Sequence, residues 1–151
     1  MNLFELSNSP SSIDIFKNTE RHFYGRSTIN DRQLLFKLDR WPYDSDEKWN
    51  FVFIELDDDE DEYGDGTFKK TGSGKEFEVF ATVKAFLEMA IREKKPDVVF
   101  FEASKTEGLS RAKLYASLVK RWIPSNYIHK IVGDEADVIY HALVSKEYEN
   151  K

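Results

Sequence analysis

The chain has 151 residues and a formal net charge of −6, and 40% of its residues are hydrophobic, including 12 Phe, 7 Tyr and 3 Trp. This length and aromatic content favour one folded domain with a hydrophobic core and exclude global disorder. The absence of cysteine excludes disulfides, thiol catalysis and thiolate metal sites, and the acidic balance disfavours broad nucleic-acid binding.

Membrane and export signals are missing from the sequence. No apolar stretch approaches the ~20 residues that a membrane helix needs. Residues 1–14 have neither the basic start nor the apolar core of a signal peptide. We therefore expect a cytoplasmic protein with no membrane partner.

The first part of the chain gives weak signals, so we treat residues 1–30 as an N-terminal appendage to a single domain over residues 31–151. Within that domain, Gln33–Leu38 is apolar and extended in character. Trp41–Asp46 is typical of a turn, because its proline and its Asp and Ser residues favour one. Asn50–Leu56 is rich in aromatic and β-branched residues and predicts a strand.

An unbroken run of acids, residues 57–62, follows this strand. It lacks the glycine that an EF-hand loop needs at its sixth position, and His22, His129 and His141 have no metal-ligand spacing. We expect no metal site. The run is a solvated loop, a surface that binds a basic protein partner, or a mimic of a nucleic-acid backbone.

The glycine junction, Lys69–Lys75 (Lys-Lys-Thr-Gly-Ser-Gly-Lys), comes next. It lies between a short predicted strand at Thr67–Thr71 and the clearest predicted helix, Lys75–Lys94, whose apolar residues recur at helical spacing. Glycines allow a tight turn and bring backbone N–H groups close to a ligand, and a helix N-terminus adds unpaired N–H groups and a positive dipole end. This combination favours an anion, most often a phosphate. The alternative is a tight turn with no ligand.

A Walker A loop is excluded at this junction. That motif needs a glycine five residues before its Gly-Lys pair, where this chain has Lys69, and a Ser or Thr after the lysine, where it has Glu76.

The remaining elements alternate between strand and helix. Val98–Phe101 is a continuous apolar run, typical of a strand buried on both faces. A second helix runs from Leu109 or Ser110 to about Trp122, and Ile128–Val132 predicts a strand. Gly133–Glu135 then turns into a terminal helix over Ala136–Glu147. The order predicts an α/β (α+β) fold, in which an antiparallel meander is followed by α-β-α-β-α around a mixed central sheet.

This order resembles the core of GNAT-type N-acetyltransferases, in which a meander leads into a helix that begins with a Q/R-x-x-G-x-G/A signature. Residues 69–74 match both glycine positions, with lysine in place of Gln or Arg. A lysine can face a phosphate as a point charge, without the fork of arginine. The resemblance implies that the pyrophosphate of acetyl-coenzyme A is bound by Lys69, Gly72, Ser73, Gly74, Lys75 and Arg111.

The resemblance also implies catalytic residues. In the family, a tyrosine in an Ala-x-x-x-Tyr-like helix can protonate the departing thiolate, and Tyr115 falls close to that place, although the alanine is one residue too near. A carboxylate on the central strands can take a proton from the amine, which points to Glu55. The alternatives are a tyrosine packed against the sheet and an acid at a strand end.

A second resemblance covers residues 49–122, which look like a group of small, uncharacterised proteins of tailed bacteriophages. It rests on Thr71–Gly74, Phe80–Val83 and Ser110–Tyr115. It implies a host-cell cytoplasmic location and no established activity.

Three functions stay open at this point. The first is an acyl-CoA-dependent N-acyltransferase. The second is a non-catalytic phage protein that kept a GNAT-like scaffold and binds a host or virion protein through residues 57–62 or through the N-terminal appendage. The third is a nucleotide or nucleic-acid binder that uses Lys69, Lys70, Lys75 and Arg111.

Overall fold

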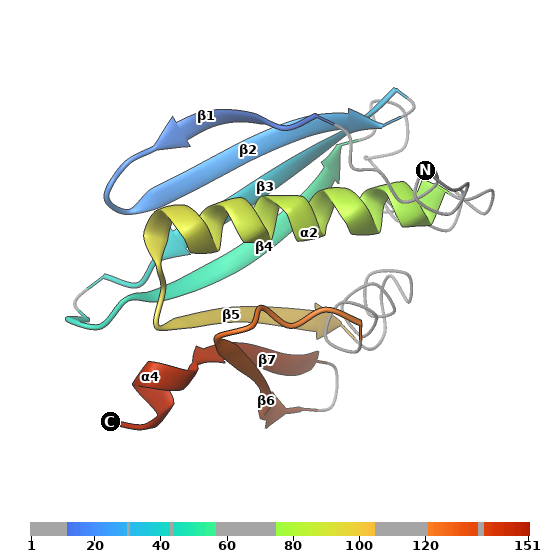
Figure 1. Cartoon of the computed structure of the whole chain (residues 1–151). Helices are drawn as coiled ribbons and strands as arrows, with labels where there is room; N and C mark the ends of the chain where they lie inside the picture. Colours follow the sequence, from blue (N-terminus) through green and yellow to red (C-terminus); the bar gives the residue numbers. More distant parts are fainter. Residues whose placement is uncertain (1–11, 30, 43, 57–74, 105–120, 136–137) are drawn as a thin grey trace.

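The computed structural model describes residues 12–29, 31–42, 44–56, 75–104, 121–135 and 138–151. These residues form one seven-stranded mixed sheet with the long helix α2 on one face (Figure 1). The strand order is β1-β2-β3-β4-β5-β7-β6. The strands are β1 (Asp14–Asn18), β2 (His22–Ile29), β3 (Arg32–Arg40), β4 (Lys48–Leu56), β5 (Val98–Ser104), β6 (Tyr127–Asp134) and β7 (Val138–Ser145), and the helices are α2 (Lys75–Lys94) and α4 (Lys146–Glu149).

Strands β1 to β4 form an antiparallel meander whose inner face is the main core. Side chains alternate between the two faces of a strand, and here every second residue is buried from Leu34 to Leu38 of β3 and from Trp49 to Phe53 of β4. The helix α2 packs on this face, with the ring of Phe86 stacked 5.0 Å from that of Phe36. The buried core side chains of the two strands are Leu34, Phe36, Leu38, Trp49, Phe51 and Phe53.

Gly25 of β2 marks a close approach between α2 and the edge of the sheet. A Cβ at this position would lie 3.0 Å from side-chain atoms of both Ile13 and Ile15, and 3.2 Å from the ring of Phe86. A glycine inside a strand often marks such a contact. Any larger residue here would push β1 or α2 outward.

The N-terminal region differs from the prediction of an appendage. Residues 14–29 are the strands β1 and β2 of the central sheet, and Phe23 and Ile29 are part of the core. The inward positions of β2 also include Gly25 and Ser27, so the apolar alternation that identifies a strand is interrupted.

The predicted terminal helix over residues 136–147 is wrong. Val138–Ser145 is the strand β7, which pairs with β5 on one side and β6 on the other. A short apolar run suits a buried helix or a buried strand equally well, and pairing with two neighbours decides for the strand. Only the short helix α4 follows, and the Ser145 side chain accepts a hydrogen bond from the backbone N–H of Tyr148 at its start.

The other predicted elements within the described residues are confirmed. The helix at Lys75–Lys94 and the strands at 33–38, 50–56, 98–101 and 128–132 are present. In the turn at 41–46, the backbone N–H of Asp46 donates to the Asp44 carboxylate at 2.9 Å. The predicted strand at 67–71 and nearly all of the predicted helix at 109–122 lie outside the described residues. Among the described helices, none has the length and apolar character that crossing a membrane requires.

Candidate ligand site where β4 and β5 diverge

The central strands β4 and β5 are parallel, and they pair only where they begin. Their ladder consists of Lys48 with Val98, Trp49 with Val99, and Asn50 with Phe100. Beyond these pairs β4 continues to Leu56 alongside β3, and β5 continues to Ser104 alongside β7. Figure 1 shows the two strands diverging toward their arrowheads.

The N-terminus of α2 lies at this open end of the sheet (Figure 1). A helix that connects two parallel strands must run back along the sheet, so it begins near the end of the first strand. The helix starts at Lys75, directly after the glycines at positions 72 and 74. Its first backbone N–H groups have no partner within the helix and carry partial positive charge.

The structure describes two of the predicted site residues. Lys75 is the first residue of α2, and Glu55 lies near the end of β4, opposite Leu34 of β3 in the register. Both positions are therefore at the open end. The other predicted residues, whose roles stay predictions, lie outside the described residues: Lys69, Gly72, Ser73, Gly74, Arg111 and Tyr115.

A pair of histidines lies on the β5 side of the divergence. His141 of β7 is opposite Phe101 of β5 in the register, and the two rings stack with centroids 5.0 Å apart. His129 of β6 and His141 lie in contact, with 2.9 Å between Nε2 of His129 and Nδ1 of His141.

Burial lowers the pKa of both histidines. It is the cause for His129 and the larger cause for His141, whose pKa the neighbouring His129 lowers further. Both imidazoles are therefore neutral at pH 7 and able to accept a proton.

Sequence reasoning did not identify this pair. The two histidines are separated by 11 intervening positions. The predicted helix over residues 136–147 put His141 on a helix, whereas it lies on a strand that pairs with the strand of His129. A prediction of a second strand after residue 135 would have identified the pair, because a β6–β7 hairpin brings the two rings onto one face.

At the opposite end of the β4–β5 ladder, here called the joined end, Asp97 holds neighbouring segments together. The backbone N–H groups of Asp97 and Val98 donate to the carbonyl of Glu47 at 2.7 and 3.1 Å, and the N–H of Glu47 donates back to the Asp97 carboxylate at 3.0 Å. The N–H of Ser145 donates to the Asp97 carbonyl at 2.8 Å. Asp97 thus joins the chain before β4, the start of β5 and the end of β7.

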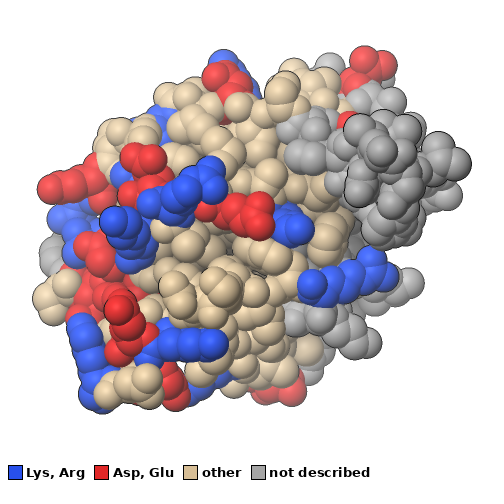
Figure 2. Space-filling model, in the orientation of Figure 1, with Lys and Arg blue, Asp and Glu red and all other residues tan. Residues whose placement is uncertain are grey.

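Charges of both signs surround this joined end. Arg40 pairs with Glu47 at 3.2 Å and Lys48 with Asp44 at 3.3 Å. The pKa of Asp44 is lowered, first by the backbone N–H of Asp46 and then by Lys48. Figure 2 shows acids and bases interspersed on this side of the molecule.

Comparison with known proteins gives structural neighbours only. No family model matches this chain, and no curated protein matches it. A probable acetyltransferase is 14% identical, with a TM-score of 0.43 over 75% of this chain and 55% of its own. A ribosomal-protein-S5-alanine acetyltransferase from Vibrio fischeri is 11% identical, with a TM-score of 0.48 over 84% of this chain and 63% of its own. A GNAT-family acetyltransferase from Bacillus anthracis is 11% identical, with a TM-score of 0.43 over 83% of this chain and 67% of its own.

The seven-stranded mixed sheet described above agrees with the α+β fold class that the sequence predicts. The chain spans 55% and 63% of the first two neighbours. At these identities and TM-scores the likeness carries no argument about activity or ligand. The resemblance to tailed-phage proteins stays a prediction.

Proposed function

We propose that this protein binds an acyl-coenzyme A at the divergence of β4 and β5 and transfers its acyl group to an amine. One observation carries the proposal. The ladder between two parallel central strands ends after three pairs, at the end of the sheet where α2 begins. The sequence Gly72-Ser73-Gly74 directly before this helix supports a diphosphate as the bound group.

The residues at the open end suit this ligand in charge and in geometry. Backbone N–H groups of the glycine junction and of the first turn of α2 would bind the pyrophosphate, with Lys69, Lys75 and Arg111 supplying positive charge. The bound thioester supplies an activated acyl group. The protein would contribute mainly by holding amine and thioester together, which can lower the barrier by ~7–11 kcal/mol.

Residues that can accept a proton belong to strands on both sides of the divergence. The neutral pair of His129 and His141 lies beyond β5, and Glu55 lies on β4. One of these groups would take the proton that the attacking amine loses, directly or through a water molecule. Tyr115 would protonate the departing thiolate, since a neutral phenol can donate a proton.

Isothermal titration of acetyl-coenzyme A into the purified protein tests the proposal. We expect micromolar affinity, and we expect Gly74→Trp to abolish it, because a large side chain would occupy the space of the pyrophosphate. Asn150→Trp is the matched control, since Asn150 is exposed after α4, near the C-terminus. No binding at millimolar coenzyme would overturn the proposal and favour a protein that kept the scaffold without the chemistry. Equal loss in both tryptophan variants would show that Gly74 has no specific role.

A further inference from the structure

The outer face of β1, β2 and β3, which lies opposite α2, carries aromatic and basic side chains side by side. Phe23 and Leu38 point into the core under α2. Strand alternation therefore places Tyr24 and Lys37 on the other face.

A row of three residues crosses this outer face. Lys17, Tyr24 and Lys37 are direct neighbours in the register of β1, β2 and β3. The ammonium groups of Lys17 and Lys37 lie 5.4 and 5.2 Å from the centroid of the Tyr24 ring. Within the part of the chain that the structure describes, no acid pairs with either ammonium group, so both can contact an anion.

A second ring extends the row. The Phe16 ring lies 6.0 Å from that of Tyr24, and the guanidinium of Arg26 lies 5.1 Å over the Phe16 ring. A register shift between Ile15 and Lys17 allows the adjacent residues Phe16 and Lys17 to share one face. The side chain of Phe16 is 44% exposed, which is unusual for so large an apolar group.

Hydrogen bonds hold Tyr24 in place. Its hydroxyl donates to the Asp39 carboxylate at 2.5 Å, and Nδ1 of His22 lies 2.7 Å from the same oxygen. Burial and the neighbouring Asp39 raise the pKa of Tyr24 to about 12, so the ring stays a neutral phenol. Tyr24 is thus a fixed, flat surface between two cations.

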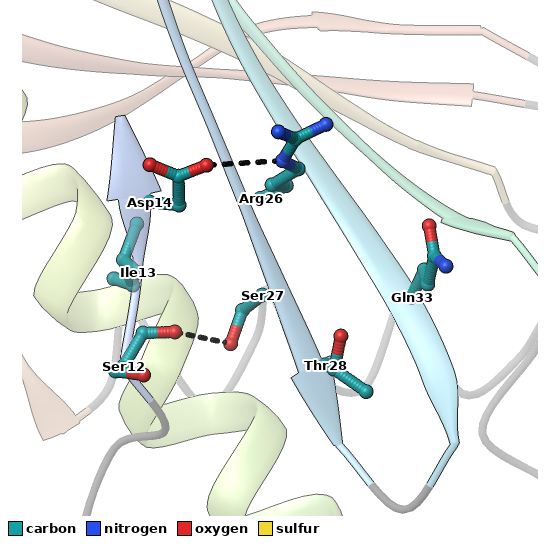
Figure 3. A pocket seen from close by; sticks show the side chains of 7 residues that line it. All are labelled: Ser12, Ile13, Asp14, Arg26, Ser27, Thr28 and Gln33. Carbon is teal, nitrogen blue, oxygen red and sulfur yellow. Dashed lines mark hydrogen bonds and ion pairs between the residues drawn. The ribbon is translucent and has the colours of Figure 1, made fainter. Parts of the chain in front are cut away.

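A polar pocket of about 510 Å³ adjoins this row at the far end of β2 (Figure 3). Two contacts shape its wall. Nε of Arg26 donates to the Asp14 carboxylate at 3.1 Å, and the Ser27 hydroxyl donates to the carbonyl of Ser12 at 2.8 Å. Thr28 and Gln33 also line the pocket, and their hydroxyl and amide groups can donate and accept hydrogen bonds.

We propose that this outer face binds a short single-stranded nucleic acid. Aromatic rings on an open sheet stack with bases regardless of sequence, and arginine guanidinium planes do the same. Lys17, Lys37 and Arg26 contact phosphates, and the pocket holds one unstacked base. The acidic net charge of the chain opposes extended electrostatic contact, so the site is local and does not take duplex DNA.

Fluorescence anisotropy with a labelled oligothymidylate of about 12 nucleotides tests the charges of this face. Three phosphate contacts predict a slope of log K against log salt concentration of about −2, since each contact on a single strand contributes about −0.7. Lys17→Gln and Lys37→Gln should each reduce the slope by about 0.7. Arg92→Gln removes the same charge from an exposed position on α2 and should leave the slope unchanged. No binding at about 50 mM salt, or equal effects of all three variants, would overturn the proposal.

A second arm tests stacking. Phe16→Ala should weaken binding about tenfold, within the range measured for loss of one base–aromatic contact. Ile131→Ala removes a similarly exposed apolar side chain from β6 and should have no effect. An abasic oligomer of the same length should bind more weakly than oligothymidylate. Equal affinity for the abasic strand, or for polyglutamate, would show a general anion surface and contradict recognition of bases.

Discussion

The two ends of the β4–β5 ladder are built differently. At the joined end, Asp97 connects three segments by backbone and carboxylate hydrogen bonds, and the Tyr148 hydroxyl donates to Asp46 at 2.8 Å. At the open end, the strands part after Asn50 and Phe100, and each follows its outer neighbour. The joined end therefore has to supply the cohesion that a full parallel ladder would otherwise give.

This difference separates stability from ligand binding along one pair of strands. A ligand that enters between two strands must not have to break their ladder, because each lost backbone hydrogen bond leaves polar groups to be satisfied again. Because β4 and β5 already diverge at the open end, a ligand there would break no backbone hydrogen bonds between them. Substitutions at the joined end should mainly reduce stability, whereas those at the open end should mainly affect the proposed ligand.

Trp49→Ala should have the largest effect on stability. Trp49 lies in the joined ladder, is 1% exposed, and donates from Nε1 to the Glu47 carboxylate at 3.0 Å. Removing a buried Trp side chain leaves a cavity and costs about 3 to 5 kcal/mol of unfolding free energy, measurable by urea denaturation. Ile54→Ala, on the diverging part of the same strand, should cost about 1 to 2 kcal/mol because Ile54 is only half-buried. Equal losses would contradict the contrast between the ends.

Asp97→Ala should have the next largest effect. The variant leaves the backbone N–H of Glu47 without its carboxylate acceptor, which should cost about 1 to 3 kcal/mol. Glu102→Ala is the matched control on the same strand β5, where the side chain is exposed, and should change stability by less than about 0.5 kcal/mol. If Asp97→Ala were as mild as the control in thermal denaturation, the junction would depend on backbone bonds alone.

The sequence predicted the parts of this architecture that local patterns determine. The helical spacing of apolar residues placed α2 at Lys75–Lys94, and aromatic and β-branched residues identified β4. It could not predict β7, because a short apolar run becomes a strand only through pairing with β5 and β6. It missed β2 for the opposite reason, since Gly25 satisfies close packing rather than hydrophobicity.

In the candidate site, too, some features follow from local sequence patterns and others only from the pairing of strands. The glycine junction before α2 is a contiguous motif and Glu55 lies on a recognisable strand, so the sequence alone suggests both, and their roles stay predictions. The pair of His129 and His141 exists only because β6 and β7 form a hairpin, so no spacing rule identifies it. The row of Lys17, Tyr24 and Lys37 likewise depends on the register of three strands.

Tyr127→Phe tests the stability of the joined end at alkaline pH. The Tyr127 hydroxyl donates to the carbonyl of Pro96 at the joined end, and its loss should cost about 1 kcal/mol near pH 7. Burial, with Asp97 and Glu147 nearby, raises the pKa of Tyr127 to about 12 from an ordinary value near 10. The stability that this group contributes is complete below pH 10 and is lost as pH rises toward 12. Urea midpoints across this range should fall less steeply in the variant; identical curves would contradict the assignment.

The smallest expected effect concerns the histidine pair beside the open end. Burial lowers the pKa of His129 and His141 in the folded protein, whereas the unfolded chain titrates near the ordinary value of 6.5. Below that pH the unfolded state binds more protons than the folded state, so stability should fall as pH decreases from 6.5 through the lowered pKa values. His141→Gln should flatten this fall in urea midpoints, and the double variant with His129→Gln should remove more of it.

Lys130→Gln is the matched control, because it changes an exposed neighbour of His129 on β6 and leaves both imidazoles in place. It should keep the acid-side fall of the wild type. If the two histidines also accept the proton of the attacking amine, the rate of acyl transfer should decline over the same acid range, and His141→Gln should lower the rate above pH 6.5, where stability is unaffected by protonation. A rate lost only together with the fold would mean that the pair stabilises the β6–β7 hairpin and that Glu55 is the remaining candidate base.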